Sequence, residues 1–273
     1  MTFLEKLNQA IDKNNSLLCV GLDPDLEKMP SKFKSAKHPL FEFDKSIIDA
    51  TANLVCCYKP NSAFYEAYGA DGMEQLQVAC RYIQQNHPHI PILLDYKRGD
   101  IGNTNNYYAK FAFEYLGVDA ITLQPYQGGE ALQPFFEYSD KGMFILVKTS
   151  NPGSNEFQNL ELDGRPLYEY VTESAVKDWN SNGNIMMVAG ATYPKELGRI
   201  REIIGSEMPI LVPGVGAQGG GVEEMLRAGL GGDRGLIINA SRQILYASNG
   251  EDFAEAAKQE ATKLRDEFNK FRG

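Results

Sequence analysis

The chain has 273 residues, of which 43% are hydrophobic and 23% are charged, and its formal net charge is -9. Its length fits one domain over residues 1–273, and its longest apolar runs are far shorter than the roughly 20 residues that a transmembrane helix needs. The negative charge repels polyanions and argues against a nucleic-acid partner, so a small phosphorylated ligand would need positive groups placed locally.

The N-terminal segment predicts a helix. Thr2 and Glu5 have the spacing of a capping box. Apolar residues follow on one face, at Phe3, Leu4, Leu7 and Ile11. The segment lacks the basic start and the apolar core of a signal peptide, so we expect a cytoplasmic protein.

Short apolar runs then alternate with helical patterns, which is typical of repeated βα units and a parallel sheet. We expect eight strands, at Leu17–Leu22, Leu54–Tyr58, Ile92–Asp95, Ala120–Leu123, Met143–Val147, Ile185–Ala189, Ile210–Val212 and Gly235–Asn239. This number and length predict an α/β fold, a (β/α)8 TIM barrel with an additional N-terminal helix. The alternative is an open doubly wound sheet, which carries a Gly-rich loop after its first strand, and Gly21-Leu22-Asp23-Pro24 is not such a loop.

Helices are expected between these strands and after the last one. They are Phe43–Asn53, Met73–Gln85, Thr104–Leu116, Leu167–Asn180, Pro194–Ile204, Val222–Ala228 and Asp252–Phe268. The one long irregular stretch runs from about Ser150 to Pro166 and is rich in Asn, Gly, Pro and acidic residues. Loops of that length in a compact domain are often lids over a binding site.

The cysteines and histidines give no metal or disulfide pattern. No C-x-x-C pair occurs among the cysteines, so we expect buried thiols at Cys19, Cys56, Cys57 and Cys80. The three histidines lie beside prolines in turn-like sequence, so we expect surface residues at His38, His87 and His89.

Charged and polar residues gather where the expected strands end. They are Asp23 after strand one, Lys59 after strand two, Asp95, Lys97 and Asp100 at strand three, and Lys148, Thr149 and Ser150 after strand five. In a parallel barrel the substrate binds among the loops at this end. Buried charges must pair, so we expect an alternating Lys-Asp array, and the alternative is an ion-pair cluster that only stabilises the rim.

Asp95 and Lys97 are two residues apart, so in an extended strand both side chains point to the same side, here toward the barrel axis. Tyr96 would then point toward the helices.

A second group of residues predicts a phosphate site. The segment from Gly214 to Gly221 after strand seven is rich in glycine, and Asn239-Ala240-Ser241-Arg242 follows strand eight. Backbone N–H groups, a helix N-terminus and the Arg242 guanidinium could together hold an anion there. The alternative is that the glycines only shape a tight turn.

The segment Asp95-Tyr96-Lys97-Arg98-Gly99-Asp100-Ile101-Gly102-Asn103-Thr104 resembles the D-x-K-x-x-D-I-x-x-T motif of orotidine 5'-phosphate decarboxylases. The resemblance covers most of the chain, through Gly21-Leu22-Asp23-Pro24, Tyr58-Lys59-Pro60-Asn61, Lys148-Thr149-Ser150-Asn151-Pro152-Gly153, Pro213-Gly214-Val215-Gly216 and Asn239-Ala240-Ser241-Arg242. The long lid is similar to that of the second, mainly bacterial subgroup of the family.

The resemblance implies a catalytic network of Lys59, Asp95, Lys97 and Asp100, with Lys97 as the proton donor. It implies a homodimer in which Asp100, Ile101 and Thr104 reach the neighbouring subunit's site. Orotidine 5'-monophosphate and uridine 5'-monophosphate are the implied ligands, without a metal or other cofactor.

The same resemblance implies the contacts with the substrate. Asp23 and Lys59 would hold ribose hydroxyls, and Ser150 would hydrogen-bond the pyrimidine. The remaining contacts fall in the phosphate region, at Pro213, Gly216, Gln218 and Arg242, of which Gln218 and Arg242 would grip the 5'-phosphate.

Two other functions remain open on the sequence. One is a metal-dependent sugar-phosphate decarboxylase or synthase of the same barrel superfamily, which would stabilise an enediolate with Mg2+. Lys59 speaks against it, because a cation at that position repels a divalent metal. The other is a non-catalytic nucleotide-binding barrel that keeps only the phosphate site.

Overall fold

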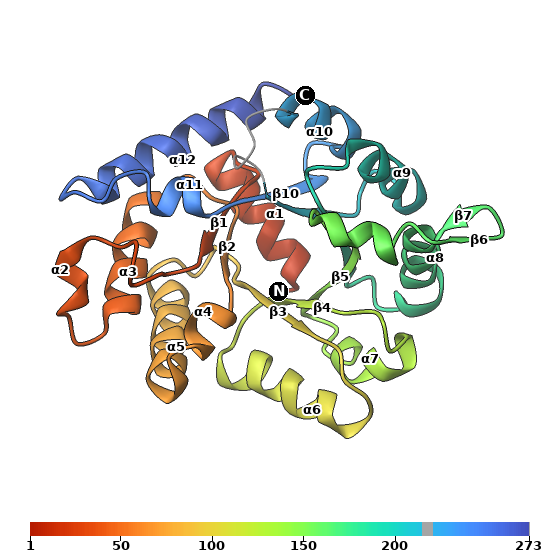
Figure 1. Ribbon diagram of the computed structural model, residues 1–273, viewed down its shortest axis with the longest axis horizontal. Helices are drawn as coiled ribbons and strands as arrows, with labels where there is room; N and C mark the ends of the chain where they lie inside the picture. The colour runs from red at the N-terminus through yellow and green to blue at the C-terminus, as the bar shows by residue number, and fades with distance from the viewer. Residues whose placement is uncertain (215–220, 273) are drawn as a thin grey trace.

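A computed structural model describes residues 1–214 and 221–272. Its main sheet has eight parallel strands in the order β2-β1-β10-β9-β8-β5-β4-β3, rolled into a barrel with helices around it (Figure 1). The strands are β1 Leu18–Leu22, β2 Cys57–Pro60, β3 Leu93–Arg98, β4 Ala120–Leu123, β5 Gly142–Lys148, β8 Ile185–Ala189, β9 Ile210–Pro213 and β10 Leu236–Ala240. The (β/α)8 TIM barrel predicted from the sequence is confirmed.

The strands β2 and β3 meet at the seam that closes the barrel. Two isolated parallel bridges join them, Tyr58↔Ile92 and Asn61↔Asp95. Two predicted strands shift here. Cys56 already donates its N–H to Leu18, but the second strand is Cys57–Pro60 and not Leu54–Tyr58, while the third extends past Asp95 to Arg98 through an irregular register.

The additional N-terminal helix is α1, Phe3–Asn14, and its capping box between Thr2 and Glu5 is present as predicted. It crosses the end of the barrel at which the strands begin (Figure 1). The Phe3 ring packs edge-on against Phe144 of β5, with centroids 5.6 Å apart. Lys6 forms an ion pair of 2.8 Å with Asp119, next to the start of β4. This helix therefore covers the face opposite the expected site.

The remaining helices surround the barrel. Their bounds are α2 Ser31–Lys34, α3 Pro39–Thr51, α4 Ala63–Glu66, α5 Gly69–Asn86, α6 Asn103–Ala109, α7 Gly129–Phe136, α8 Leu167–Ser174, α9 Pro194–Ile204, α10 Val222–Gly229, α11 Arg242–Leu245 and α12 Phe253–Asn269. Two helices that were predicted as continuous change to π-helical turns in their second halves, η1 at Lys110–Tyr115 and η3 at Ala175–Trp179. Such turns are local insertions that the apolar periodicity does not reveal.

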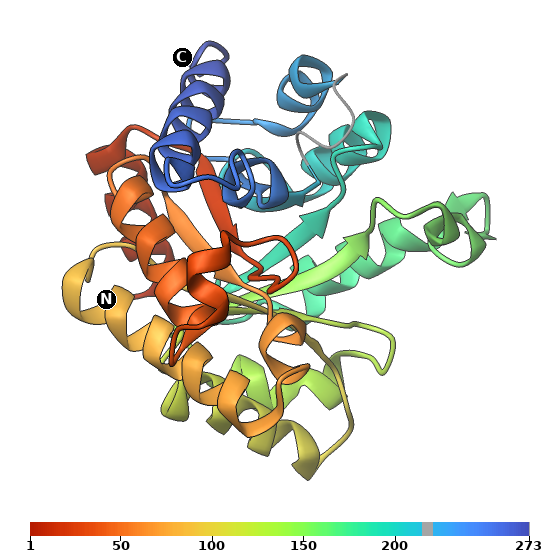
Figure 2. The same cartoon turned by 60° about the vertical axis from the view of Figure 1, so that its left-hand side comes forward.

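The segment from Ser150 to Pro166 is more regular than predicted. It contains a short 3-10 helix, η2 at Pro152–Glu156, and a small hairpin of β6 Glu161–Leu162 with β7 Arg165–Pro166. Asp163 and Gly164 join the two strands with φ of 51° and 74°, the left-handed geometry that tight hairpins require. The hairpin projects away from the barrel (Figure 2).

All four cysteines are buried and free, as predicted. The histidines are not simple surface residues, because each is half-buried. The His87 ring packs edge-on against Tyr82, at a centroid distance of 6.3 Å. No helix in the described part of the chain is long and apolar enough to cross a membrane.

Candidate active site

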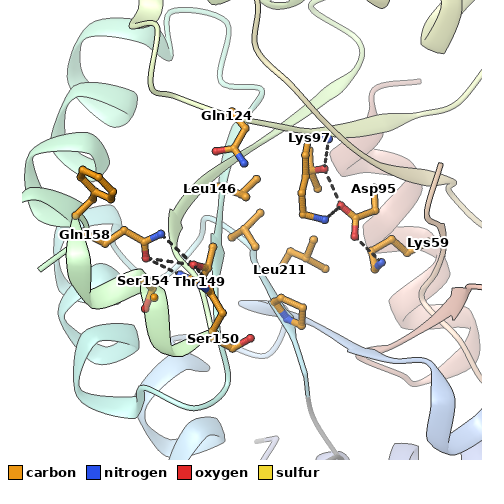
Figure 3. Close-up of a pocket in the computed structure, with 16 residues that line it drawn as sticks. Lys59, Asp95, Lys97, Gln124, Leu146, Thr149, Ser150, Ser154, Gln158 and Leu211 are labelled. Atoms are coloured by element: carbon orange, nitrogen blue, oxygen red, sulfur yellow. Dashed lines mark hydrogen bonds and ion pairs between the residues drawn. The ribbon is translucent and has the colours of Figure 1, made fainter. Parts of the chain in front are cut away.

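A cavity of about 520 Å³ opens at the carboxyl ends of the strands, the face expected to bind substrate. Its charged wall comes from β2 and β3, and its opposite wall comes from the segment after β5 (Figure 3). Leu146, Val188 and Leu211 form an apolar floor between these walls. The cavity thus combines an apolar floor with charges on one side, and electrostatic interactions are stronger in apolar surroundings than in water.

Lys59, Asp95 and Lys97 form a continuous ion-pair network on the charged wall (Figure 3). Lys59 Nζ lies 3.0 Å from Asp95 Oδ2, and Lys97 Nζ donates to Asp95 Oδ1. The Lys59 side chain is 3% exposed, whereas that of Lys97 is 46% exposed. Both lysines line the cavity, and the Lys97 side chain is the more exposed of the two.

The contacts within the network keep Asp95 and Lys59 ionised. Burial alone would raise the pKa of Asp95, but the ammonium groups of Lys59 and Lys97 hold it well below its usual range. Burial alone would lower the pKa of Lys59, but the carboxylates of Asp95 and Asp23 raise it above the ordinary lysine value. The site therefore carries fixed charges at neutral pH.

The backbone of β3 departs from a regular strand where these charges sit. Leu94 pairs with Ile121 and Arg98 pairs with Leu123, so the ladder is irregular between them. Lys97 has a φ of 47°, which is uncommon for a residue with a side chain. Asp95 and Lys97 do point together into the cavity, but a bulge brings them there and not the simple alternation that we expected. Tyr96 is buried away from the site, as predicted.

The sequence analysis did not identify three polar residues beside the charged network. Thr122 of β4 donates to Asp95 Oδ1 at 2.9 Å, and Asn61 Nδ2 lies 3.5 Å from Asp95 Oδ2. Gln124 lines the cavity beside them. A polar Thr122 inside the apolar run Ala120–Leu123 was the available signal.

The opposite wall includes Ser150, which lines the cavity together with Pro213. A Cβ on Gly190 would lie 2.7 Å from the backbone nitrogen of Ser150, so glycine is required for this close approach. Thr149 donates its N–H to Gln158 at 2.8 Å. This contact ties the end of β5 to the segment Ser150 to Pro166.

Lys148 does not join the charged network, contrary to our expectation. The register of β5 shifts between Leu146 and Lys148, and its Nζ donates to the side-chain oxygens of Ser154, Asn155 and Asn159 at 3.1, 3.0 and 2.9 Å. Burial lowers its pKa, and its side chain is only 1% exposed. The ion pairs at this end of the described chain therefore join Lys59, Asp95 and Lys97, and Lys148 serves the segment after β5 instead.

Asp23 follows β1 and is half-buried. Its Oδ1 is buried and finds no hydrogen-bond partner in residues 1–214 and 221–272. The Tyr246 hydroxyl donates to the backbone oxygen of Asp23 at 2.9 Å, which fixes the turn after the strand. An unpartnered buried acceptor next to Lys59 suits a ligand hydroxyl.

Asp100, Ile101 and Thr104 are not among the residues that line this cavity. Asp100 Oδ1 accepts the N–H of Ile101 at 2.7 Å, and Asn105 accepts the N–H of Asp100 at 3.0 Å. Ile101 is 61% exposed. These residues thus belong to a turn that does not line the cavity of their own chain.

The predicted phosphate region is described in part. The register Asn239↔Pro213 places the segments after β9 and β10 side by side, and Arg242 begins α11 as an exposed residue. Gly216 and Gln218 lie outside the described residues. Within the described ranges, no group of three or more His, Cys, Asp or Glu side chains could hold a metal ion.

The comparisons with known proteins agree in family and fold. A sequence model of the orotidine 5'-phosphate decarboxylase / HUMPS family matches residues 16–257. The chain is 50% identical over 273 residues to the orotidine 5'-phosphate decarboxylase of Dechloromonas aromatica, covering 100% of both chains. It is 50% identical over 272 residues to that of Cellvibrio japonicus, covering 98% of each.

Two solved structures from Leishmania donovani are similar to the chain. Its OMP decarboxylase superimposes with a TM-score of 0.85 at 40% identity, covering 100% of this chain and 99% of that chain. Its UMP synthase gives a TM-score of 0.88 at 41% identity, covering 100% of this chain and 56% of that chain.

Proposed function

The chain belongs to the orotidine 5'-phosphate decarboxylase / HUMPS family, and we propose that it converts orotidine 5'-monophosphate into uridine 5'-monophosphate and CO2, a carboxy-lyase step of pyrimidine biosynthesis. The network of Lys59, Asp95 and Lys97 in the cavity carries this conclusion. Relatives that match over the full chain at 45–50% identity bear the decarboxylase name.

The chemistry requires a fixed positive charge. When the bond between C6 and the carboxylate breaks, CO2 leaves and the electron pair stays on C6 in the plane of the ring, where the π system cannot delocalise it. The ammonium of Lys97 stabilises this carbanion electrostatically, because it is already oriented before the reaction. It then donates a proton to C6 and regains one from solvent, so the scheme needs no cofactor.

The other charges of the network hold Lys97 and the ribose. Asp95 orients the two lysines, because its carboxylate contacts both ammonium groups. The unpartnered Oδ1 of Asp23 and the ammonium of Lys59 are suited to ribose hydroxyls.

The rest of the substrate would lie across the cavity. Ser150 hydrogen-bonds the pyrimidine from the opposite wall, and Pro213 borders the ring. Gly216, Gln218 and Arg242 hold the 5'-phosphate after β9 and β10. Phosphate contacts far from C6 supply binding energy for closing the segment Ser150 to Pro166 over the substrate.

The active form in this proposal is a homodimer of single-domain chains, residues 1–273. Asp100, Ile101 and Thr104 do not line their own cavity, and Ile101 is exposed, so we assign them to the neighbouring subunit's site. Large apolar side chains are exposed around them, namely Tyr107 on α6 and Tyr126 before α7. Exposed apolar patches of this kind mark protein interfaces.

The same family model also covers HUMPS enzymes, and a metal-dependent sugar-phosphate reaction is the competing function. The buried ammonium of Lys59 on Asp95 disfavours it, because a divalent metal would meet a cation where it needs a carboxylate. We place the enzyme in the cytoplasm, where four free thiols stay reduced.

The test is the fall in ultraviolet absorbance when purified protein meets orotidine 5'-monophosphate in EDTA, with Lys97→Ala as the control. We expect turnover by the wild type and none measurable by Lys97→Ala, with affinity for uridine 5'-monophosphate changed by about tenfold at most. Wild-type protein that leaves the substrate unchanged but acts on a sugar phosphate with Mg2+ would overturn the assignment.

A further inference from the structure

Thr122 of β4 lies opposite the bulge of β3. Leu94 pairs with Ile121, and Arg98 pairs with Leu123. The three residues Asp95, Tyr96 and Lys97 therefore oppose the single residue Thr122. In such a bulge the backbone N–H groups lose their partners in the sheet, and a buried N–H without a partner costs free energy.

The hydroxyl of Thr122 supplies those partners. Its Oγ1 accepts the N–H of Tyr96 at 2.9 Å and the N–H of Lys97 at 3.0 Å, and it donates its own proton to Asp95 Oδ1 at 2.9 Å. A hydroxyl has one donor and two acceptor sites, so its hydrogen-bonding capacity is fully used. Thr122 is buried, which leaves little room for water to take over these bonds.

These three bonds act on the two reactive groups at once. The bond to Lys97 N supports a backbone with φ of 47°, which a lysine rarely adopts. The bond to Asp95 Oδ1 fixes the oxygen that also accepts from Lys97 Nζ. The direction of the Lys97 ammonium thus depends on one hydroxyl through both its main chain and its carboxylate partner.

We propose that Thr122 is a positioning residue for the decarboxylation, which holds Lys97 and Asp95 in the reactive geometry through the three bonds of its hydroxyl. This inference rests on the proposed function. Thr122 acts through its two neighbours, so its loss should impair the chemical step more than the binding of substrate or product.

The experiment compares Thr122→Val, which keeps the shape and removes the hydroxyl, with Thr122→Ser, which keeps the hydroxyl. We expect Thr122→Val to lower kcat about a hundredfold, because a misplaced catalytic group costs on that order. Its KM and its affinity for uridine 5'-monophosphate should stay within about threefold of the wild type, and Thr122→Ser should keep kcat within about threefold.

Thr172→Val is the matched control. Thr172 is equally buried, but its hydroxyl donates at 2.7 Å to Tyr168 in its own helix, away from the cavity. The same chemical change there should leave kcat unaltered. Full kcat in Thr122→Val, or equal losses in the serine and valine variants, would overturn the inference.

Amide hydrogen exchange gives a readout that does not depend on activity. In the wild type the amides of Tyr96 and Lys97 should be protected although they lie in a bulge, and in Thr122→Val both should exchange faster. Rapid exchange of both amides in the wild type would overturn the positioning role even if the valine variant did not fold. A wild type that does not decarboxylate the substrate, with both amides protected, would refute the proposed function and leave the positioning of Lys97 standing.

Discussion

Two buried lysines lie at the same end of the barrel in opposite electrostatic surroundings. Lys59 on β2 pairs with Asp95 at 3.0 Å, and its pKa is raised by the carboxylates of Asp95 and Asp23 against the effect of burial. Within the described residues, Lys148 on β5 donates to the neutral side-chain oxygens of Ser154, Asn155 and Asn159, and burial lowers its pKa.

The difference separates two tasks that one residue type can perform. A charge that must persist during chemistry is paired with an opposite charge, as at Lys59. A charge that only holds a loop can be satisfied by hydrogen bonds to neutral acceptors. Breaking such bonds costs less free energy than separating an ion pair. The ring of Tyr193 lies 4.3 Å from Lys148 Nζ and adds a cation–π contact without adding a negative charge.

Removing the paired lysine should have the largest effect. Lys59→Met leaves Asp95 buried with one partner fewer, so we expect the free energy of unfolding to fall by about 3 kcal/mol. Turnover should fall about a thousandfold, because the electrostatic network is incomplete. Urea denaturation and the absorbance assay measure the two effects.

Lys177→Met is the control, since its side chain is 68% exposed and lies 3.7 Å from Glu173. It should change stability by less than about 0.5 kcal/mol. A Lys59→Met variant as stable and active as this control would remove the distinction between the two buried lysines.

Removing the unpaired lysine should have a smaller effect, and of a different kind. Lys148→Met relieves the burial of an uncompensated charge but frees three acceptors of the lid segment. We expect a change in unfolding free energy within about 1 kcal/mol and a rise in KM of about tenfold, because the lid is less well held. Limited proteolysis within residues 150–166 should become faster. A loss of stability as large as that of Lys59→Met would contradict the comparison.

The smallest effect should appear in alkaline solution. The folded pKa of Lys148 is lowered, so between that value and the unfolded lysine pKa of about 10.4 the unfolded chain binds more protons, and stability relative to Lys148→Met rises with pH. The folded pKa of Lys59 is raised, so its contribution is complete below about 10.4 and is lost only as pH rises through the folded value.

Denaturation of the wild type and both methionine variants between neutral pH and pH of about 10 measures this difference: stability relative to Lys148→Met should rise with pH, whereas stability relative to Lys59→Met should stay constant. Tyr193 and Glu196 are the titratable neighbours of Lys148, and both raise its pKa. If the difference in unfolding free energy between wild type and variant changed with pH in the same way for both lysines, their electrostatic surroundings would be alike and the comparison would be wrong.

The barrel could be predicted because its signal is repeated along the chain. Each strand is a short apolar run followed by a helical period, and the parallel sheet then fixes which residues share the catalytic face. Lys59, Asp95 and Lys97 follow from that rule. The start of β2 was placed too early because Leu54 and Val55 are apolar without being paired in the sheet.

The sequence analysis misplaced Lys148 and overlooked Thr122 for the same physical reason: the pairing register shifts locally in β5 and in β3. The shift in β5 sends Lys148 to the lid, and the bulge in β3 gives Thr122 its role. A bulge depends on pairing between strands far apart in sequence, so no spacing within one strand reveals it. The hairpin of β6 and β7 was missed because its strands have two residues each.

The seam between β2 and β3 has a consequence for how the enzyme loses activity. Only two isolated bridges, Tyr58↔Ile92 and Asn61↔Asp95, join these strands in the described structure. Lys59 stands on one side of the seam and Asp95 on the other. A fluctuation that parts the barrel there separates the Lys59–Asp95 ion pair first, so we expect rising denaturant to inactivate the enzyme before its helices melt.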